Sequence, residues 1–414
     1  MTCEIAVMNK FGIALAADSA VTVGDGQKIY HHAQKLFQLH RAIPVGIMIY
    51  GSAEIMAMPW EIVVRSYGQH IGERKLGTIE DYAQDFLRFT EASDALFPAS
   101  LQREWYRNTV GCYWSDEILR PLTARLKKSP TKSRHDTTAI LTQILKRDHA
   151  IWRKYPAIED RWATHGDRVI AEYGPELDEI EKDLFGRHAL SQELRYGLHT
   201  TARYMYSQRW FHPRDRSWIV FAGMGETESF PVLQAYQVGS IAANRLRSVK
   251  IDEARITREE SACVVPLAQS DMIDMFYRGI DPELDQKLTH IVARCVSDAM
   301  PGKTEKLKPA QIRKIQKTFR RALEEEIDDK YKRPLMAAVD ALPRHDLAKI
   351  AETLVSLTAF RKRMSIEQRE TVGGSIDVAI LSKGEGFCWV KRNDPFQRAA
   401  VPAALSVAEQ IQAH

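Results

Sequence analysis

The sequence predicts an α+β fold, in which strands at both ends and in the middle of the chain are separated by two long helical blocks. The continuous apolar run at residues 13–17 is too short for a helix and is typical of a buried strand, and residues 217–222 and 375–381 are strand-like as well. Between them the chain is rich in charged residues, leucine, alanine and aromatics at helical spacing. Glycine-containing turns separate the strands.

The composition is that of a globular protein. The chain has 414 residues, of which 44% are hydrophobic and 27% charged, so disorder is excluded as its main state. Its 58 lysines and arginines exceed its 54 acidic residues by only four, which gives no reason to expect a nucleic-acid or membrane partner. The charged stretch 303–332 interleaves both signs, which is typical of a solvated, salt-bridged helix face.

Cysteine usage and the absence of targeting patterns favour the cytoplasm. The five cysteines are widely spaced, and none lies in a CxxC or zinc-ligand pattern, so we expect reduced thiols. We find no secretory signal and no apolar run of membrane-spanning length. The pairs His31-His32 and His135-Asp136 lack companions at ligand spacing. We therefore expect them to be surface residues, with no metal and no organic cofactor.

The first part of the chain is expected to form strands and then a helix. Gly51-Ser52 ends the strand region and leads into an apolar-periodic helix at about residues 53–67. Turn signals precede and follow the second strand. The expected strands cover residues 2–8, 13–17, 35–39 and 45–50.

The two helical blocks are expected at about residues 78–211 and 271–364. Five of the eight tryptophans fall in the first block, which indicates a packed helical core. Between the blocks, a strand at 217–222 precedes Gly223-Met224-Gly225. The other elements expected outside the blocks are a helix at 231–247, a strand at 262–267 and a hairpin of 375–381 and 386–390 around Gly384.

The most informative residue for chemistry is Thr2. Threonine is small enough for Met1 to be trimmed, and we expect that trimming to leave a free α-amine beside the Thr2 hydroxyl. An N-terminal amine is one of the bases that can activate a threonine hydroxyl. A neighbouring lysine would keep that amine neutral by like-charge repulsion.

This segment resembles the catalytic β-subunits of the proteasome and the related bacterial ATP-dependent peptidase subunits, which are N-terminal-nucleophile hydrolases. The resemblance rests on Thr2, on GIALAADS at residues 12–19, on Lys35 and on Gly51. In that family an aspartate follows the nucleophile by sixteen positions, as Asp18 follows Thr2 here.

The same spacing selects Thr2 over its neighbour. Cys3 would give a separation of fifteen and the wrong strand register. Later parts of the chain match more loosely. Residues 219–225 are similar to the family's later strand and glycine turn, and Gly373-Gly374 is similar to its late Gly-Gly strand.

The resemblance implies a four-layer αββα sandwich with two long helical insertions. The implied core segments are 1–75, 215–270 and 367–414, and the insertions are 76–214 and 271–366.

The resemblance also implies roles for single residues. Thr2 would attack through its hydroxyl while its α-amine moves the proton. Lys35 would set the local charge, Asp18 would hold Lys35, and the Gly51 N–H would donate to the developing oxyanion. Lys28 is a rival for the ammonium, although Lys35 fits the start of a strand better.

The family's substrate-binding positions carry over as well. Thr22 would pair its backbone with an extended peptide. Phe37, Ile49 and Ala53, together with Ala57, would lie near the first specificity pocket, and all four are apolar.

Two positions depart from the family. Met224 stands between glycines where a serine is usual, and Arg369, Glu370, Thr371 and Val372 occupy the place of an expected Asp and Ser. Glu370 or Glu226 is a possible substitute for these groups.

The implied activity is hydrolysis of peptide or other amide bonds through an acyl-Thr2 intermediate. We accordingly expect a peptide or protein substrate and assembly into a homo-oligomer. By analogy alone, the resemblance also implies an ATP-driven unfoldase as a partner. Two alternatives stay open. One is a catalytically idle scaffold whose helical blocks bind proteins, and the other is an amidase acting on small non-peptide amides.

Overall fold

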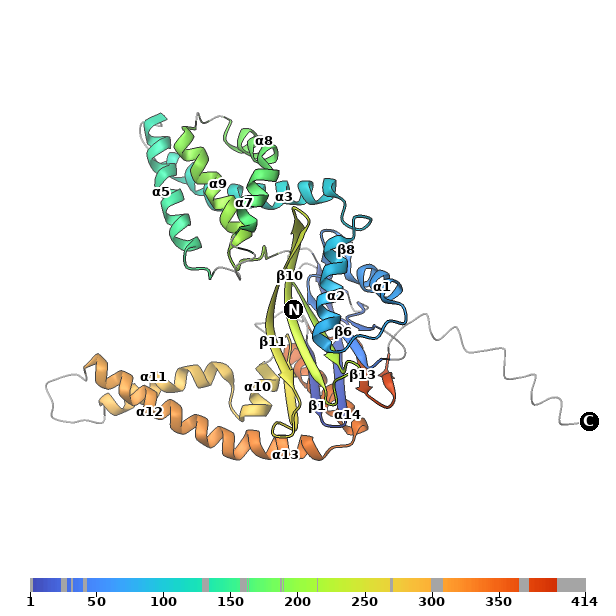
Figure 1. The fold of residues 1–414 in the computed structure, drawn as a ribbon. Helices are drawn as coiled ribbons and strands as arrows, with labels where there is room; N and C mark the ends of the chain where they lie inside the picture. Colours follow the sequence, from blue (N-terminus) through green and yellow to red (C-terminus); the bar gives the residue numbers. More distant parts are fainter. Residues whose placement is uncertain are drawn as a thin grey trace, which may run out of the picture. The chain divides into compact units, whose positions relative to one another are not determined.

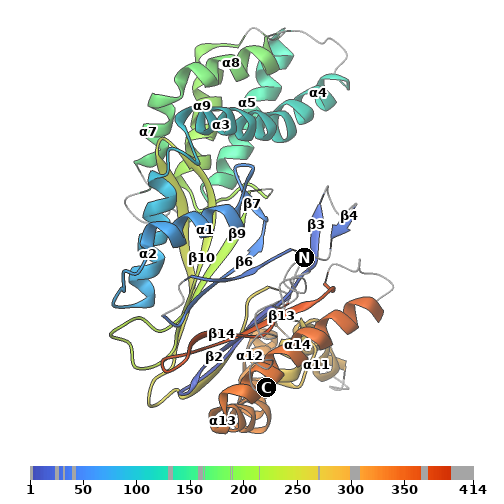
Figure 2. The ribbon, with the colours of Figure 1, turned by 90° about the vertical axis from the view of Figure 1, so that its right-hand side faces the viewer.

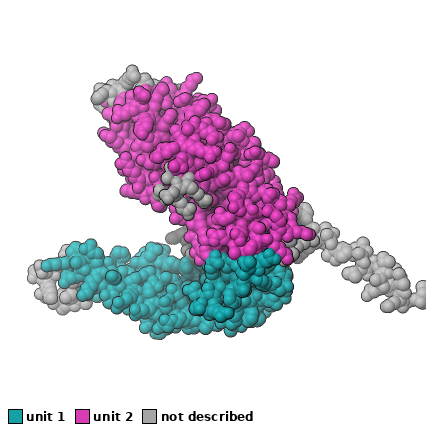
Figure 3. Space-filling model, in the orientation of Figure 1, with its two compact units in different colours: residues 1–48, 222–232, 254–414 teal, residues 49–221, 233–253 magenta. Residues whose placement is uncertain are grey.

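The computed structural model describes residues 3–23, 28–30, 33–39, 43–128, 134–156, 162, 164–186, 188, 190–213, 215–268, 271–298, 308–364 and 372–392. These residues form a mixed fold of helices and antiparallel sheets, which confirms the predicted α+β class. The chain divides into two compact units (Figure 3). Unit 1 contains residues 1–48, 222–232 and 254–414, and unit 2 contains residues 49–221 and 233–253.

Unit 1 is built on a five-stranded sheet of order β12-β1-β2-β13-β14. Its central strands are mostly apolar and are buried on both faces, which explains why they lack an alternating pattern. β1 and β2 pair with Val7 opposite Ala14, and β13 pairs with β2 with Val378 opposite Ala16. The strands are β1 (Glu4–Asn9), β2 (Gly12–Asp18), β12 (Ala262–Pro266), β13 (Ile376–Ser382) and β14 (Gly386–Lys391).

Helix α14 (Arg344–Met364) covers this sheet (Figure 2). Its buried face presents Leu347, Ala351 and Val355 to the side chains of the central strands, and the two sets form one apolar cluster. Burying a leucine or valine side chain contributes roughly 1.5–3 kcal/mol, so this helix and sheet stabilise one another. The ends of β2 and β13 are thereby fixed in place.

The second five-stranded sheet has the order β11-β10-β9-β6-β5. Four of its strands continue from one unit into the other along the chain. The strands are β5 (Leu36–Gln38), β6 (Val45–Gly51), β9 (Ser217–Gly223), β10 (Val232–Ala242) and β11 (Arg245–Arg255). Those expected at 35–39, 45–50 and 217–222 are confirmed.

The prediction of a helix at residues 231–247 is wrong, because this segment is a β-hairpin. β10 is buried along almost its whole length, so its apolar residues do not alternate and are compatible with a helical period as well. Ala243 and Asn244 both have positive φ, 48° and 55°. Two such residues form the tight turn that matches the twist of paired strands.

The helix expected at 53–67 begins later than predicted. A short ribbon of β7 (Glu54–Ile55) and β8 (Met58–Pro59) comes first, and Met56 and Ala57 turn it with positive φ. Helix α1 (Trp60–Ile71) then starts directly after Pro59. A second small ribbon pairs β3 (Val21–Val23) with β4 (Lys28–Tyr30).

Helices α1 and α2 (Ile79–Ala92) pack together through aromatic side chains. Tyr67 meets Phe86 edge-on at 5.1 Å, and Phe86 meets Phe221 of β9 at 5.4 Å. The Trp60 indole N–H donates to Ser217 Oγ at 2.8 Å. These contacts fix α1 and α2 to the sheet within unit 2.

The first helical block of unit 2 has its own core (Figure 1). Trp114 and Trp152 are fully buried in unit 2 and Trp162 is nearly so, whereas Trp105 and Trp210 are half-buried. The block consists of α3 (Ala99–Tyr113), the π-helical turn η1 (Trp114–Leu119), α4 (Arg120–Leu126), α5 (Arg134–Trp152), α7 (His165–Glu172), α8 (Gly174–Phe185) and α9 (Gln192–Ser207).

The second helical block belongs to unit 1 and is much more exposed. Within residues 308–332, Arg321 pairs with Glu325 and Lys330 with Glu326 one turn apart, as the interleaved charges predict. In Figure 1, α11 and α12 lie side by side. No helix in the described part is long and apolar enough to cross a membrane. The block consists of α10 (Asp271–Arg278), α11 (Pro282–Asp298), α12 (Pro309–Ile327), η2 (Asp328–Lys332) and α13 (Arg333–Ala341).

Candidate active site

Asp18 and Lys35 form a buried ion pair in unit 1. Lys35 Nζ donates to Asp18 Oδ1 at 2.7 Å. Asp18 is the last residue of β2, and Lys35 directly precedes β5. Only 1% and 5% of these residues is exposed. Two charges withdrawn from water to this extent need further hydrogen bonds to offset the loss of solvation.

Backbone groups supply those hydrogen bonds. The Cys3 N–H donates to Asp18 Oδ1 at 3.0 Å, and the Gly373 N–H donates to Asp18 Oδ2 at 3.0 Å. Both carboxylate oxygens are therefore engaged, by donors that come from three separate parts of the chain. Charge-assisted hydrogen bonds of this kind are roughly twice as strong as neutral ones.

Ser19 extends the same network beyond the end of β2. Its N–H donates to the Ser375 carbonyl at 2.9 Å, and the two hydroxyls lie 3.0 Å apart. The Ser19 carbonyl accepts from the Ala33 N–H at 3.1 Å. Through these bonds, Ser19 holds both the residue before β13 and the segment that leads to Lys35.

The Cys3 thiol is unsuited to act as a nucleophile. Cys3 is completely buried in the cluster beneath α14. Burial raises the pKa of its thiol to about 12, and a hydrogen bond with Thr358 offsets this only in part. A thiol attacks as the thiolate, which is scarce at neutral pH with such a pKa.

The structure brings together two of the four residues predicted to be catalytic, Asp18 and Lys35. Thr2 lies outside the described residues. Gly51 ends β6 and belongs to unit 2.

Gly51 occupies a position that requires glycine. Its φ is +91°, and a Cβ there would lie 2.6 Å from both the Arg216 carbonyl oxygen and the Trp218 ring. The next residue, Ser52, donates its N–H to the Arg216 carbonyl at 2.9 Å. The stacked rings of Tyr50 and Trp218, 5.2 Å apart, support the strand end from the same side.

The residues predicted to bind substrate have different surroundings. Phe37 and Ile49 are buried, with 4% and 5% exposed, whereas Ala53 is exposed. Thr22 lies in the β3–β4 ribbon, where its backbone is opposite Ile29. The side chains of Thr22 and of Lys28, the rival ammonium, lie outside the described part of the molecule.

The two departures from the family pattern can be examined in part. Met224 is buried, and its N–H donates to the Pro44 carbonyl at 3.0 Å. The Gly225 N–H donates to Glu228 Oε2 at 2.9 Å. Glu370 lies outside the described residues.

Two functional contacts were missed from sequence, the Cys3 and Gly373 N–H groups that bind Asp18. The pair Gly373-Gly374 was predicted only as the start of a late strand. Backbone donors have no side-chain signature, so only the register of β13 against β2 could have indicated the second contact.

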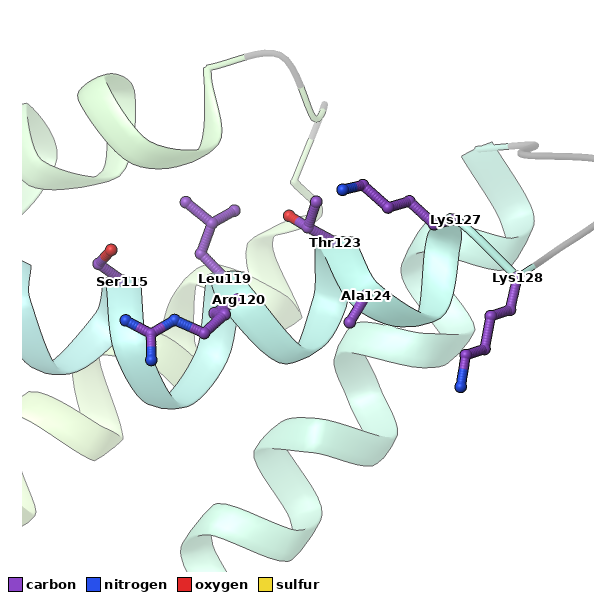
Figure 4. A pocket seen from close by; sticks show the side chains of 7 residues that line it. All are labelled: Ser115, Leu119, Arg120, Thr123, Ala124, Lys127 and Lys128. Atoms are coloured by element: carbon purple, nitrogen blue, oxygen red, sulfur yellow. The ribbon is translucent and has the colours of Figure 1, made fainter.

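A cavity of about 250 Å³ lies within unit 2 next to Ser52. Trp105 of α3 and Asp215 are among its lining residues. A larger, more open groove of about 510 Å³ runs along η1 and α4, with Arg120, Lys127 and Lys128 on its walls (Figure 4). Their charged ends point in different directions in Figure 4, so they do not converge on one anion.

One group among the described residues offers three ligand atoms of the kind that metals bind. Asp178, Glu181 and His199 place these atoms within 4.8 Å of one another. Arg195 already pairs with Glu181 at 2.9 Å, and Asp178 is exposed. An arginine bound to a ligand carboxylate competes with a metal ion, so we assign no metal to this group.

No protein-family model matches the chain. A search of curated proteins also finds no match.

Solved structures named Anbu are similar to the chain along most of its length. The Gly-1 mutant of Anbu from Hyphomicrobium sp. strain MC1 is 10% identical, with 96% of this chain and 91% of that chain covered and a TM-score of 0.30. Anbu from Yersinia bercovieri, described as an ancestral beta-subunit, is 9% identical with the same coverages and a TM-score of 0.29. Likeness at these TM-scores is too low to establish a shared fold.

Proposed function

We propose that the protein is an N-terminal-nucleophile hydrolase that cleaves peptide or other amide bonds through Thr2. One observation carries the proposal. The buried Asp18 carboxylate binds both the Lys35 ammonium and the N–H of Cys3. Cys3 is bonded to Thr2, so the same carboxylate that holds the ammonium also holds the residue next to the proposed nucleophile.

The proposed chemistry balances with protein groups and water alone. The Thr2 hydroxyl oxygen bonds to the substrate carbonyl carbon, and its proton passes to the α-amine. The C–N bond then breaks, and the leaving amine takes that proton. Water hydrolyses the resulting ester and restores the hydroxyl.

Lys35 and Asp18 serve this reaction through charge. An ammonium beside the α-amine lowers the pKa of that amine from its ordinary value near 8, which leaves it neutral and able to accept a proton. Asp18 keeps Lys35 in place and compensates its burial. For Gly51 we propose donation of its backbone N–H to the oxyanion.

The architecture that accompanies this proposal is the four-layer αββα sandwich. In such a sandwich two sheets form the inner layers, and helices form the outer layers. The proposed core segments are 1–75, 215–270 and 367–414, and the insertions are 76–214 and 271–366. Thr22, Phe37, Ile49 and Ala53 are the proposed substrate contacts.

We test the proposal by intact-mass measurement before and after incubation with an epoxyketone. Such a reagent needs both the threonine hydroxyl and a free α-amine to form its ring adduct. Loss of Met1 together with a single adduct is the expected result, and Thr2→Ala should remove the adduct. Lys35→Ala should abolish adduct formation, whereas Lys28→Ala should leave it unchanged. Retention of Met1, or an equal adduct in Thr2→Ala, would refute the proposal.

A scaffold without catalytic activity is the second candidate, and Met224 favours it. A buried methionine stands where the resemblance implies a serine hydroxyl near the α-amine. The epoxyketone experiment separates the two functions, because a scaffold forms no adduct. Small amides and unfolded proteins, offered as alternative substrates, separate an amidase from a peptidase.

We also propose that the chain forms a homo-oligomer, as the proteasome-like family does. Light scattering coupled to size exclusion measures the subunit number directly. An ATP-driven unfoldase partner is proposed by analogy alone, and stimulation of protein degradation by such an ATPase would test it.

A further inference from the structure

The first helical block and the loop after Gly51 enclose the cavity of about 250 Å³ described above. Ser52, Glu54 and Met56 form one wall, and Trp105 of α3 and the pair His212 and Asp215 form another. All of these residues belong to unit 2, so the cavity is a feature of one compact unit. It is smaller than the roughly 300–1,000 Å³ of drug-sized pockets and suits a single side chain.

Two residues that line the cavity, Ser52 and Asp215, are neighbours in sequence of Gly51 and of Arg216, whose carbonyl contacts Gly51. Ser52 follows Gly51 and is held by the Arg216 carbonyl at 2.9 Å, and Asp215 directly precedes Arg216. Gly51 itself packs against that same carbonyl. Ser52, which lines the cavity, is therefore the residue covalently next to the proposed oxyanion donor.

The walls carry net negative charge. Asp215 and Glu54 contribute two carboxylates, against one imidazole from His212, and no lysine or arginine is among the lining residues. The Trp105 indole N–H donates to Asp215 Oδ2 at 3.0 Å, which fixes the carboxylate in position. His212 Nδ1 lies 3.9 Å from the same oxygen.

An indole beside two carboxylates, of which Asp215 is held by a hydrogen bond, forms surroundings that favour a cation. The carboxylates attract the charge, and the aromatic face adds a cation–π contribution once water is displaced. An anionic group would meet two like charges here.

We propose that this cavity binds a cationic group of the substrate, such as an arginine or lysine side chain or a primary amine. The first helical block thus supplies a specificity site that the strand core alone would lack. The cation preference itself is a binding property, and only its effect on catalysis rests on the proposed function.

The test compares the binding of arginine amide and citrulline amide by calorimetry, in wild type and in Thr2→Ala. The two ligands have nearly the same shape and differ in charge. We expect arginine amide to bind at least tenfold more tightly. Glu54→Gln and Asp215→Asn should each reduce that preference several-fold, and Glu80→Gln, a change to an exposed acid of α2 outside the cavity, should not.

Equal binding of the two amides, or no binding of either, would overturn the inference. So would a preference that Glu54→Gln and Asp215→Asn leave unchanged in proteins with wild-type melting temperatures. A cation preference together with no epoxyketone adduct in the wild-type protein would support the cavity and refute the hydrolase. An adduct without a cation preference would do the reverse.

Discussion

At the scale of single residues, the Asp18–Lys35 pair links stability to the proposed chemistry. Lys35→Met would leave a buried carboxylate without its cation, which costs about 3–5 kcal/mol when one partner of a buried pair is removed. The double variant Lys35→Met with Asp18→Asn removes both charges, so we expect it to recover much of the lost stability and no activity. Urea unfolding and epoxyketone labelling measure the two effects separately.

Full labelling of the double variant would contradict the role of Lys35. Equal stability of the single and double variants would show that the two side chains do not depend on one another. Lys75→Met is the matched control, because Lys75 is exposed and belongs to neither the pair nor its hydrogen-bond network.

The cysteines give a second prediction at this scale. With its pKa raised to about 12 by burial, the Cys3 thiol should resist iodoacetamide at pH 8 in the folded protein. Cys112 and Cys295 are exposed and should react under the same conditions. Peptide mass spectrometry reads each position separately. Alkylation of Cys3 as fast as of Cys112 would mean that the segment beneath α14 opens readily.

The family resemblance indicated one contact of the candidate site before the fold was known. The resemblance to the proteasome-like family implied that Asp18 holds Lys35, and the structure joins the two side chains at 2.7 Å. The N–H groups of Cys3 and Gly373 could not be predicted in the same way. Their role depends on how β2, β13 and the first residues converge, which is set by tertiary packing.

At the scale of elements, Arg247 of β11 anchors the end of α9. Its guanidinium donates to the backbone carbonyls of Met205, Gln208 and Trp210, and it lies 5.2 Å from the Tyr206 ring. Arg247→Met should therefore destabilise the protein by about 3 kcal/mol, because buried carbonyls lose charged donors. Arg209→Met, at an exposed position nearby, should change stability by less than about 0.5 kcal/mol in the same urea titration.

His165 at the start of α7 makes the same block sensitive to acid. Burial, and then the charge of Arg247 and its neighbours, lowers the pKa of His165 to about 3. The unfolded value is near 6.5, so the unfolded chain takes up the proton first. The stability that the neutral, buried His165 imidazole contributes is fully present above pH 6.5 and is lost as pH falls toward 3. Unfolding free energy should drop by about 2 kcal/mol between pH 7 and pH 5.

The control for this prediction is His165→Phe, which keeps a ring in the same place. We expect the drop between pH 7 and pH 5 to be smaller by about 2 kcal/mol in that variant. An unchanged pH dependence would show that other groups carry the effect. The exposed His70→Phe tests whether any histidine substitution has the same result.

Element prediction succeeded where apolar runs were short and bounded by turns. It failed at residues 231–247, because a strand buried on both faces has no period that distinguishes it from a buried helix. The positive φ angles of Ala243 and Asn244 fixed the hairpin there. Alanine gives no sequence signal for such a turn, unlike the glycine at Gly384 that marked the final hairpin.

At the scale of the whole molecule, four strands run along the chain from one unit into the other. β6, β9, β10 and β11 each have residues in both. Seven of the eight tryptophans belong to unit 2, whereas the buried Cys3 belongs to unit 1. Tryptophan fluorescence and Cys3 alkylation therefore report on different units.

Because unfolding either unit would disrupt strands of the other, we expect both signals to change together in one cooperative transition. Leu198→Ala in the core of the first helical block should lower stability by roughly 2–5 kcal/mol. It should shift both curves by the same amount, although Leu198 and Cys3 belong to different units. Loss of fluorescence at a urea concentration that leaves Cys3 protected would mean that the units unfold independently. The insertion could then bind and release substrate without disturbing the Asp18–Lys35 pair.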